Sequence, residues 1–112
     1  MFNRTFALPS GPRVRIRLAT RADRTAVARL MADRGVVVSD LEVLRLLTYD
    51  PTRRRVACAL APVDGRETLV GIAAMDLRPD AEVDTLVVDE RLTDGLGEVL
   101  TGVLAGRASR AA

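Results

Sequence analysis

Apolar residues alternate strictly with arginine over residues 13–18, in the run Arg-Val-Arg-Ile-Arg-Leu. An alternation with a period of two residues predicts a β-strand that buries one face. Upstream, the turn sequence Pro-Ser-Gly-Pro at 9–12 would fold residues 2–8 back as an edge strand. We therefore expect two strands at the start of the chain, an edge strand at 2–8 and its neighbour at 13–18.

Two helices are expected after this strand. The first begins near the capping residue Thr20, and its apolar residues recur at helical spacing: Ala26, Val27, Leu30 and Met31. The second begins with a capping box formed by Ser39 and Glu42 and carries one stripe of leucines: Leu41, Leu44 and Leu47. Asp50-Pro51 ends this second helix, because the residue before a proline disfavours helical geometry.

The second half of the chain predicts three strands and a helix. The strands are expected at 56–61, 68–77 and 82–88, with turns at 63–66 and 78–80 between them. From Asp94 onward, apolar residues recur at helical spacing: Leu96, Val99, Leu100, Val103 and Leu104. The order β-(β)-α-α-β-β-β-α predicts one α/β domain that spans residues 1–112.

The amino-acid composition excludes several kinds of catalytic residue. The 112 residues are 48% hydrophobic and 29% charged, which is typical of one globular domain. There is no histidine, and all 17 basic residues are arginine, so imidazole bases and lysine nucleophiles are excluded. The single Cys58 lies between two alanines, as a small buried residue would, and no acidic cluster predicts a metal site. Without a membrane span or an apolar signal core, we expect a cytoplasmic protein.

The basic residues favour a solvated surface over a nucleic-acid site. The pI is about 9.4, but the net charge is only +2 because 15 acidic residues are interspersed with the arginines. Arg53, Arg54 and Arg55 form the one contiguous basic run, and aromatic residues amount to only 3%. Nucleic-acid binding through this run and the strand arginines Arg13, Arg15 and Arg17 therefore stays a third hypothesis, more distant than the two given below.

Two glycines stand where the last helix begins, at Gly95 and Gly97. Glycine allows a ligand to approach the backbone, and the first amides of a helix lack intrahelical partners. Together with the helix dipole, these amides can hold an anion such as a pyrophosphate. The pattern is weak by itself, because glycines at helix starts also serve tight turns.

In its element order, the chain resembles the GNAT superfamily of acyl-CoA N-acyltransferases. The segment 15–23, Arg-Ile-Arg-Leu-Ala-Thr-Arg-Ala-Asp, is similar to the family's first strand and helix start. The segment 87–98, Val-Val-Asp-Glu-Arg-Leu-Thr-Asp-Gly-Leu-Gly-Glu, is similar to its acyl-CoA loop. The resemblance implies a mixed, mainly antiparallel sheet with helices on both faces, and transfer of an acetyl group from acetyl-CoA to an amine. The resemblance covers the N-terminal two thirds of the family's fold and does not include its C-terminal third.

The resemblance also implies the cofactor-binding residues. The backbone of Val87 and Val88 would face the acyl and pantetheine arm, and amides of the helix start would hold the pyrophosphate: Asp94, Gly95, Leu96, Gly97 and Glu98. Three positions depart from the family's pattern, namely Arg91, Leu92 and Asp94. The carboxylates of Asp94 and Glu98 oppose a diphosphate, unless Arg91 and another arginine compensate from the side.

Candidates for the catalytic base lie on the strand at 82–88. Alternation predicts that Glu82, Asp84, Leu86 and Val88 share one face, which would border the acyl site. In the resemblance, Glu82 is the first candidate for the base that accepts the amine proton, and Asp84 is the second. The alternative is that both are exposed surface residues beside the turn at 78–80. Tyr49, the only tyrosine, matches no catalytic position and is expected to pack.

Two functional hypotheses stay open from the sequence. The first is an acetyltransferase that acts on a small-molecule or protein amine and completes its site as a homodimer through the edge of the strand at 82–88. The second is a noncatalytic GNAT-like module that binds a ligand or a partner protein.

Overall fold

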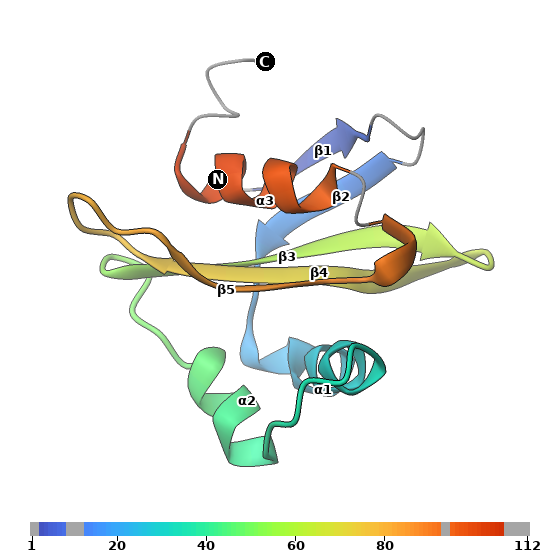
Figure 1. Ribbon diagram of the computed structural model, residues 1–112, viewed down its shortest axis with the longest axis horizontal. Helices are drawn as coiled ribbons and strands as arrows, with labels where there is room; N and C mark the ends of the chain where they lie inside the picture. Colours follow the sequence, from blue (N-terminus) through green and yellow to red (C-terminus); the bar gives the residue numbers. More distant parts are fainter. Residues whose placement is uncertain (1–2, 9–12, 93–94, 107–112) are drawn as a thin grey trace.

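All neighbouring strands of the single five-stranded sheet are antiparallel, in the spatial order β1-β2-β3-β4-β5 (Figure 1). The computed structural model describes residues 3–8, 13–92 and 95–106. The strands are β1 (Asn3–Ala7), β2 (Arg13–Leu18), β3 (Arg54–Val63), β4 (Arg66–Asp76) and β5 (Val83–Val88). Each strand therefore pairs with its neighbour in sequence, and β1 and β5 form the two edges.

Helices cover both faces of the sheet. A short 3-10 turn, η1 (Arg21–Asp23), leads into α1 (Arg24–Asp33), which α2 (Asp40–Leu46) follows. A second 3-10 turn, η2 (Glu90–Leu92), precedes α3 (Leu96–Leu104). Helices α1 and α2 lie on one face and α3 lies on the other (Figure 1). The predicted fold class and element order are confirmed. Within the described residues, no helix has the length and apolarity that a membrane crossing requires.

The core consists of two apolar layers, one on each side of the sheet. On the α3 side, the helix contributes Leu96, Leu100, Val103 and Leu104, which pack on alternate residues of β2, β3 and β4. On the α1/α2 side, Val27, Leu30, Met31, Val43 and Leu47 pack on the intervening strand residues. Because both of their faces are buried, β3 and β4 are almost continuously apolar.

The strand β4 has a β-bulge at Val70, next to a glycine that lies beneath α3. The register passes from the pair Ala59–Gly71 to the pair Leu60–Leu69, so Val70 is one extra residue on β4. A Cβ on Gly71 would lie 2.9 Å from Cδ1 of the buried Leu100. Only glycine therefore fits beneath α3 here without a shift of that leucine.

The β3–β4 hairpin turns at Asp64 and Gly65, whose φ angles are 51° and 79°. Two successive positive φ angles are typical of a type I′ turn, for which Asp-Gly is a preferred sequence. The turn expected at 63–66 is confirmed.

The predicted leucine stripe of the second helix is wrong in part, since Leu47 is buried as expected but Leu41 is not. The residues of α2 and its C-cap that are buried against the sheet are Val43 and Leu47, whereas Leu41 is 55% exposed. Each helical residue turns by about 100°, so Leu41 stands roughly 200° from Val43, on the far side of the helix. The capping box itself is confirmed, since the side chain of Ser39 accepts a hydrogen bond from the amide of Glu42 and the Glu42 carboxylate accepts one from the amide of Ser39.

Candidate functional site

The strand β5 is an open edge of the sheet, and η2 separates it from the start of α3. Beyond the last residue of β5, the amide of Asp89 donates a 2.7 Å hydrogen bond to the carbonyl oxygen of Val70 on β4. Backbone groups alternate between the two sides of an antiparallel strand, so the backbone groups of Leu86 and Val88 point to the open edge. Those of Val87 point to β4. Of the two valines expected to meet a pantetheine arm, Val88 presents its backbone to the edge.

The helix α3 begins at a glycine in a left-handed conformation. Gly95 adopts φ +96°, a left-handed conformation that favours glycine, and no side chain caps the helix from that position. The first intrahelical bond of α3 runs from the amide of Val99 to the carbonyl of Gly95. The amides of Leu96, Gly97 and Glu98 therefore precede the intrahelical ladder. Asp94 lies outside the described residues.

The loop between β5 and α3 is held by an ion pair. Arg91 donates from Nε and Nη2 to the two carboxylate oxygens of Asp89, at 3.0 and 2.8 Å, and its backbone amide also binds Asp89. These bonds lower the pKa of the Asp89 carboxyl. Leu92, which departs from the family's polar residue, is buried in the α3-side layer with Leu96. Leu92 thus anchors the loop to the core.

The two candidate bases differ in their surroundings. Asp84 is an extra residue on β5, because the register passes from the pair Ala74–Thr85 to the pair Met75–Val83. Its carboxylate accepts two bonds of 2.7 Å from Arg54, which lower its pKa. Glu82 precedes β5 and is exposed.

The prediction that Asp84 shares one face with Leu86 and Val88 is wrong, and the bulge is the reason. Residues two positions apart on a strand share a face, so Arg54 lies on the same face as Val56, which belongs to the α1/α2-side layer. Because Asp84 binds Arg54, its side chain lies on that face too. Leu86 lies over Gly97 of α3, and Val88 packs on the α3-side layer. The role of Arg54 was missed in the sequence, since nothing local links residues that are 30 positions apart.

Tyr49 and Cys58 have structural roles. The hydroxyl of Tyr49 lies 2.7 Å from the carbonyl oxygen of Ala19 and 3.3 Å from that of Val56, and burial raises its pKa. It ties the end of α2 to the sheet, as the packing interpretation expected. Cys58 is fully buried, and burial raises the pKa of its thiol to about 12. A thiol in this state is a poor nucleophile.

The contiguous arginines do not act as one basic patch. Arg54 binds Asp76 as well as Asp84, and Arg55 donates a 3.0 Å hydrogen bond to the carbonyl of Leu104 at the end of α3. Arg53 is exposed and lies 3.8 Å from a carboxylate oxygen of Asp50. Two of these guanidiniums are therefore used inside the domain, which weakens the nucleic-acid hypothesis. In the part of the chain that the structure describes, no group of acidic and sulfur side chains could hold a metal ion.

Comparisons with known proteins identify the fold. No family model and no curated protein matches the chain. Among solved structures, the GNAT domain of S. lividans PAT superposes with a TM-score of 0.75 at 16% identity, over 96% of this chain and 72% of that one. A ribosomal-protein-alanine N-acetyltransferase from Brucella melitensis biovar Abortus 2308 superposes with a TM-score of 0.62 at 25% identity, over 87% of this chain and 72% of that one. The fold that the sequence resemblance implied is confirmed, and this chain has the fold of the GNAT superfamily.

Proposed function

We propose that this domain binds acetyl-CoA and transfers its acetyl group to an amine. The observation that carries the proposal is the start of α3, where Gly95 adopts φ +96° in the segment that follows the edge strand β5. The GNAT fold supports it, and one of the two neighbours is named as an N-acetyltransferase.

In this proposal the two halves of the coenzyme meet two kinds of backbone group. The amides from Asp94 to Glu98 bind the pyrophosphate at the positive end of α3. The backbone of Val88 at the open edge of β5 pairs with the amide-containing pantetheine arm, with Val87 beside it. The carboxylate of Glu98 is exposed in the first turn of α3 and reduces the affinity for the diphosphate.

The chemical step needs one base. The amine nitrogen attacks the thioester carbonyl carbon, its proton passes to Glu82 directly or through water, and the carbon–sulfur bond then breaks. Coenzyme A leaves as a thiolate and is protonated by solvent. Glu82 suits the base better than Asp84, because Arg54 holds the Asp84 carboxylate and lowers its pKa.

A homodimer completes the site in this proposal. The chain spans about 72% of the length of both neighbouring structures, and β5 is left as an edge of the sheet. Leu86 on this strand is 45% exposed although its side chain lies on the α3 face. An unpaired strand edge beside an exposed leucine favours pairing with a second copy.

Calorimetric titration with acetyl-CoA tests the binding step, and release of free thiol in the presence of a panel of amines tests the transfer. We expect saturable heat and an amine-dependent release of thiol. Absence of both heat and a thermal shift at millimolar acetyl-CoA would overturn the proposal.

The second candidate function is a noncatalytic module that binds an acyl-CoA or a partner protein. Two observations favour it: the Asp84 carboxylate is held by Arg54, and the Tyr49 hydroxyl is used by backbone carbonyls. Saturable binding of acetyl-CoA without thiol release for any amine would support this module over the enzyme.

A further inference from the structure

A concave region lies where β4 extends past the end of β5. The last pair between these strands joins Gly71 to Val88, so residues 66–70 of β4 continue beyond β5. The chain leaves the sheet through η2, and a cleft of about 250 Å³ is left between α1 and the projecting end of β4. A hollow of about 290 Å³ adjoins it and shares four lining residues: Leu30, Asp33, Asp89 and Arg91.

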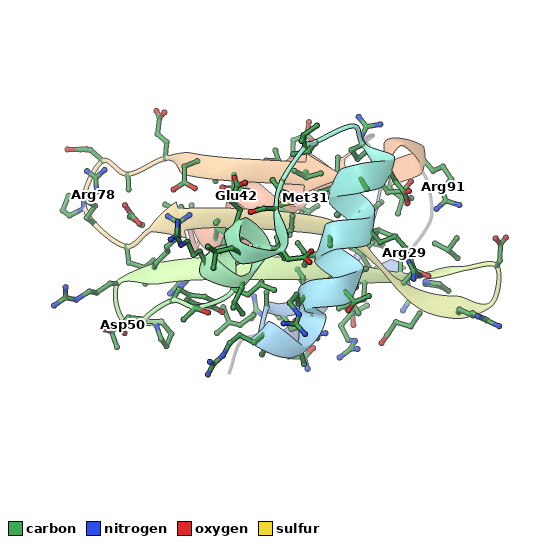
Figure 2. The ribbon with its side chains drawn as sticks, turned by 90° about the horizontal axis from the view of Figure 1, so that it is seen from below. Arg29, Met31, Glu42, Asp50, Arg78 and Arg91 are labelled. Carbon is green, nitrogen blue, oxygen red and sulfur yellow. The ribbon has the colours of Figure 1, made fainter. Side chains whose placement is uncertain are left out.

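Three guanidinium groups from three separate elements line this cleft. Arg29 comes from α1, Arg66 from β4 and Arg91 from η2. Figure 2 views the face covered by α1 and α2, and it shows Arg29 and Arg91 on the same side of α1. Because these arginines come from distant segments of the sequence, only the fold brings them together.

Some of the charged side chains in the cleft form ion pairs and others do not. Arg91 is bound to Asp89, and Glu67 is bound to Arg15 of β2 at 2.6 Å. Within the described residues, neither Arg29 nor Arg66 forms an ion pair. Asp33, one helical turn beyond Arg29, is the remaining acidic group of the lining. Outside these ion pairs, Arg29 and Arg66 contribute two positive charges and Asp33 one negative charge, so the cleft has an excess of positive charge.

The floor of the cleft is apolar. The side chains of Leu30 and Leu69 are buried beneath it, and Ala26 completes the lining on the α1 side. An apolar floor with a few polar groups at the rim is the usual construction of a small-molecule site. Guanidinium groups recognise carboxylate and phosphate by paired hydrogen bonds.

We propose that this cleft binds a small organic anion, whose carboxylate or phosphate group meets Arg29 and Arg66 while its apolar body lies on Leu30 and Leu69. No described residue of α3 lines the cleft, and α1 and α3 lie on opposite faces of the sheet (Figure 1). Among the described residues, the cleft shares only Asp89 and Arg91 with the segment at 87–98 that leads to the start of α3. The proposal does not depend on acetyl transfer.

Titrations of the full chain followed by two-dimensional NMR test the proposal with three probes of equal chain length: hexanoate, hexyl phosphate and hexylammonium. We expect both anions to shift the amides around the cleft and hexylammonium to leave them unchanged. The tighter of the two anions identifies carboxylate or phosphate as the recognised group. Arg29→Gln combined with Arg66→Gln should weaken anion binding by about tenfold or more, whereas Arg53→Gln, which removes an exposed arginine outside the cleft, should not.

Equal shifts with hexylammonium, or anion binding that is unchanged in the Arg29→Gln/Arg66→Gln variant, would overturn the proposal. Displacement of the anion by acetyl-CoA would also overturn it, because the cleft would then belong to the coenzyme site. Titration of the Arg29→Gln/Arg66→Gln variant with acetyl-CoA tests the two proposals separately. If the cleft is independent of the coenzyme site, the variant loses anion binding but keeps its affinity for acetyl-CoA.

Discussion

The guanidinium of Arg54 on β3 donates two hydrogen bonds of 2.7 Å, one to each carboxylate oxygen of Asp84 on β5. The same guanidinium also binds Asp76 on β4, at 2.9 Å. One arginine thus joins three adjacent strands at the point where β5 bulges. This contact distinguishes the two candidate bases, because both residues are exposed but the Asp84 carboxylate is held in an ion pair.

Glu82→Gln and Asp84→Asn are expected to have different effects on acetyl transfer. Loss of the base should lower kcat by about 100-fold or more in Glu82→Gln. Asp84→Asn should retain most of kcat and lose no more than about 1 kcal/mol of folding stability, because the Asp84 side chain is 46% exposed and solvent screens its ion pair. Steady-state kinetics and urea unfolding measure both effects. A larger loss of kcat in Asp84→Asn than in Glu82→Gln would contradict the assignment.

Gly97→Ala should weaken acetyl-CoA binding without damage to the fold. A Cβ at Gly97 would lie 3.5 Å from Cδ2 of Leu86, an ordinary contact, and alanine favours a helix by about 0.5–1 kcal/mol over glycine. The added methyl group would stand beside the amides proposed to hold the pyrophosphate, so calorimetry should show an affinity about tenfold lower.

Gly71→Ala is the matched control for stability. Its methyl group would crowd the buried Leu100 and should cost about 1–3 kcal/mol in urea unfolding. If Gly97→Ala binds acetyl-CoA as tightly as the unchanged chain, the helix start is not the diphosphate site.

Leu86→Lys should abolish self-association. A lysine on an edge strand opposes pairing with a second strand, because its charge would be desolvated in the interface. Leu41→Lys is the control, since Leu41 is also an exposed leucine, at 55%, but lies on α2. Analytical ultracentrifugation should show a dimer for the unchanged chain and for Leu41→Lys, and a monomer for Leu86→Lys. A monomeric unchanged chain at millimolar concentration would refute the β5 interface.

Asp23→Asn should lower stability at neutral pH and have little effect in acid. Two hydrogen bonds from Arg17, at 2.8 and 2.9 Å, lower the pKa of the Asp23 carboxyl, whose side chain is only 10% exposed. A carboxyl with a lowered folded-state pKa stabilises the fold above its unfolded pKa of about 3.9, and this stabilisation is lost as pH falls through the folded value.

The unfolding free energy of Asp23→Asn should therefore be about 2 kcal/mol lower than that of the unchanged chain at pH 7, with the difference shrinking below pH of about 4. Asp64→Asn, in the exposed hairpin turn, should show no such difference. A gap of constant size between pH 7 and pH 3 would contradict the ion-pair explanation.

The local elements of the fold were predictable because their signals are local. The alternation at 13–18 became β2 with the same bounds, and the Asp-Gly turn became the hairpin of β3 and β4. The helix start at Gly95 was also readable, since glycine before an apolar helical stripe has a direct conformational meaning. The stripe of α2 was misassigned, because three leucines in the sequence do not show which side of a helix meets the sheet.

The site was predictable only in part. Val88 and the residues from Gly95 to Glu98 lie together at the end of β5 and the start of α3, as their sequence adjacency implied. The positions of Glu82 and Asp84 depended on a one-residue bulge, which shifts side chains to the other face of a strand. The arginine cleft could not be foreseen, since Arg29 and Arg66 are brought together only by the packing of α1 on the sheet.

By itself, the sequence determined the order of elements, the caps and turns, and the glycine-marked helix start, because each depends on residues a few positions apart. The tertiary structure alone decided which carboxylate is held by Arg54 and which arginines share a cleft. These features depend on strand register and helix placement, and both result from the packing of segments that are distant in sequence.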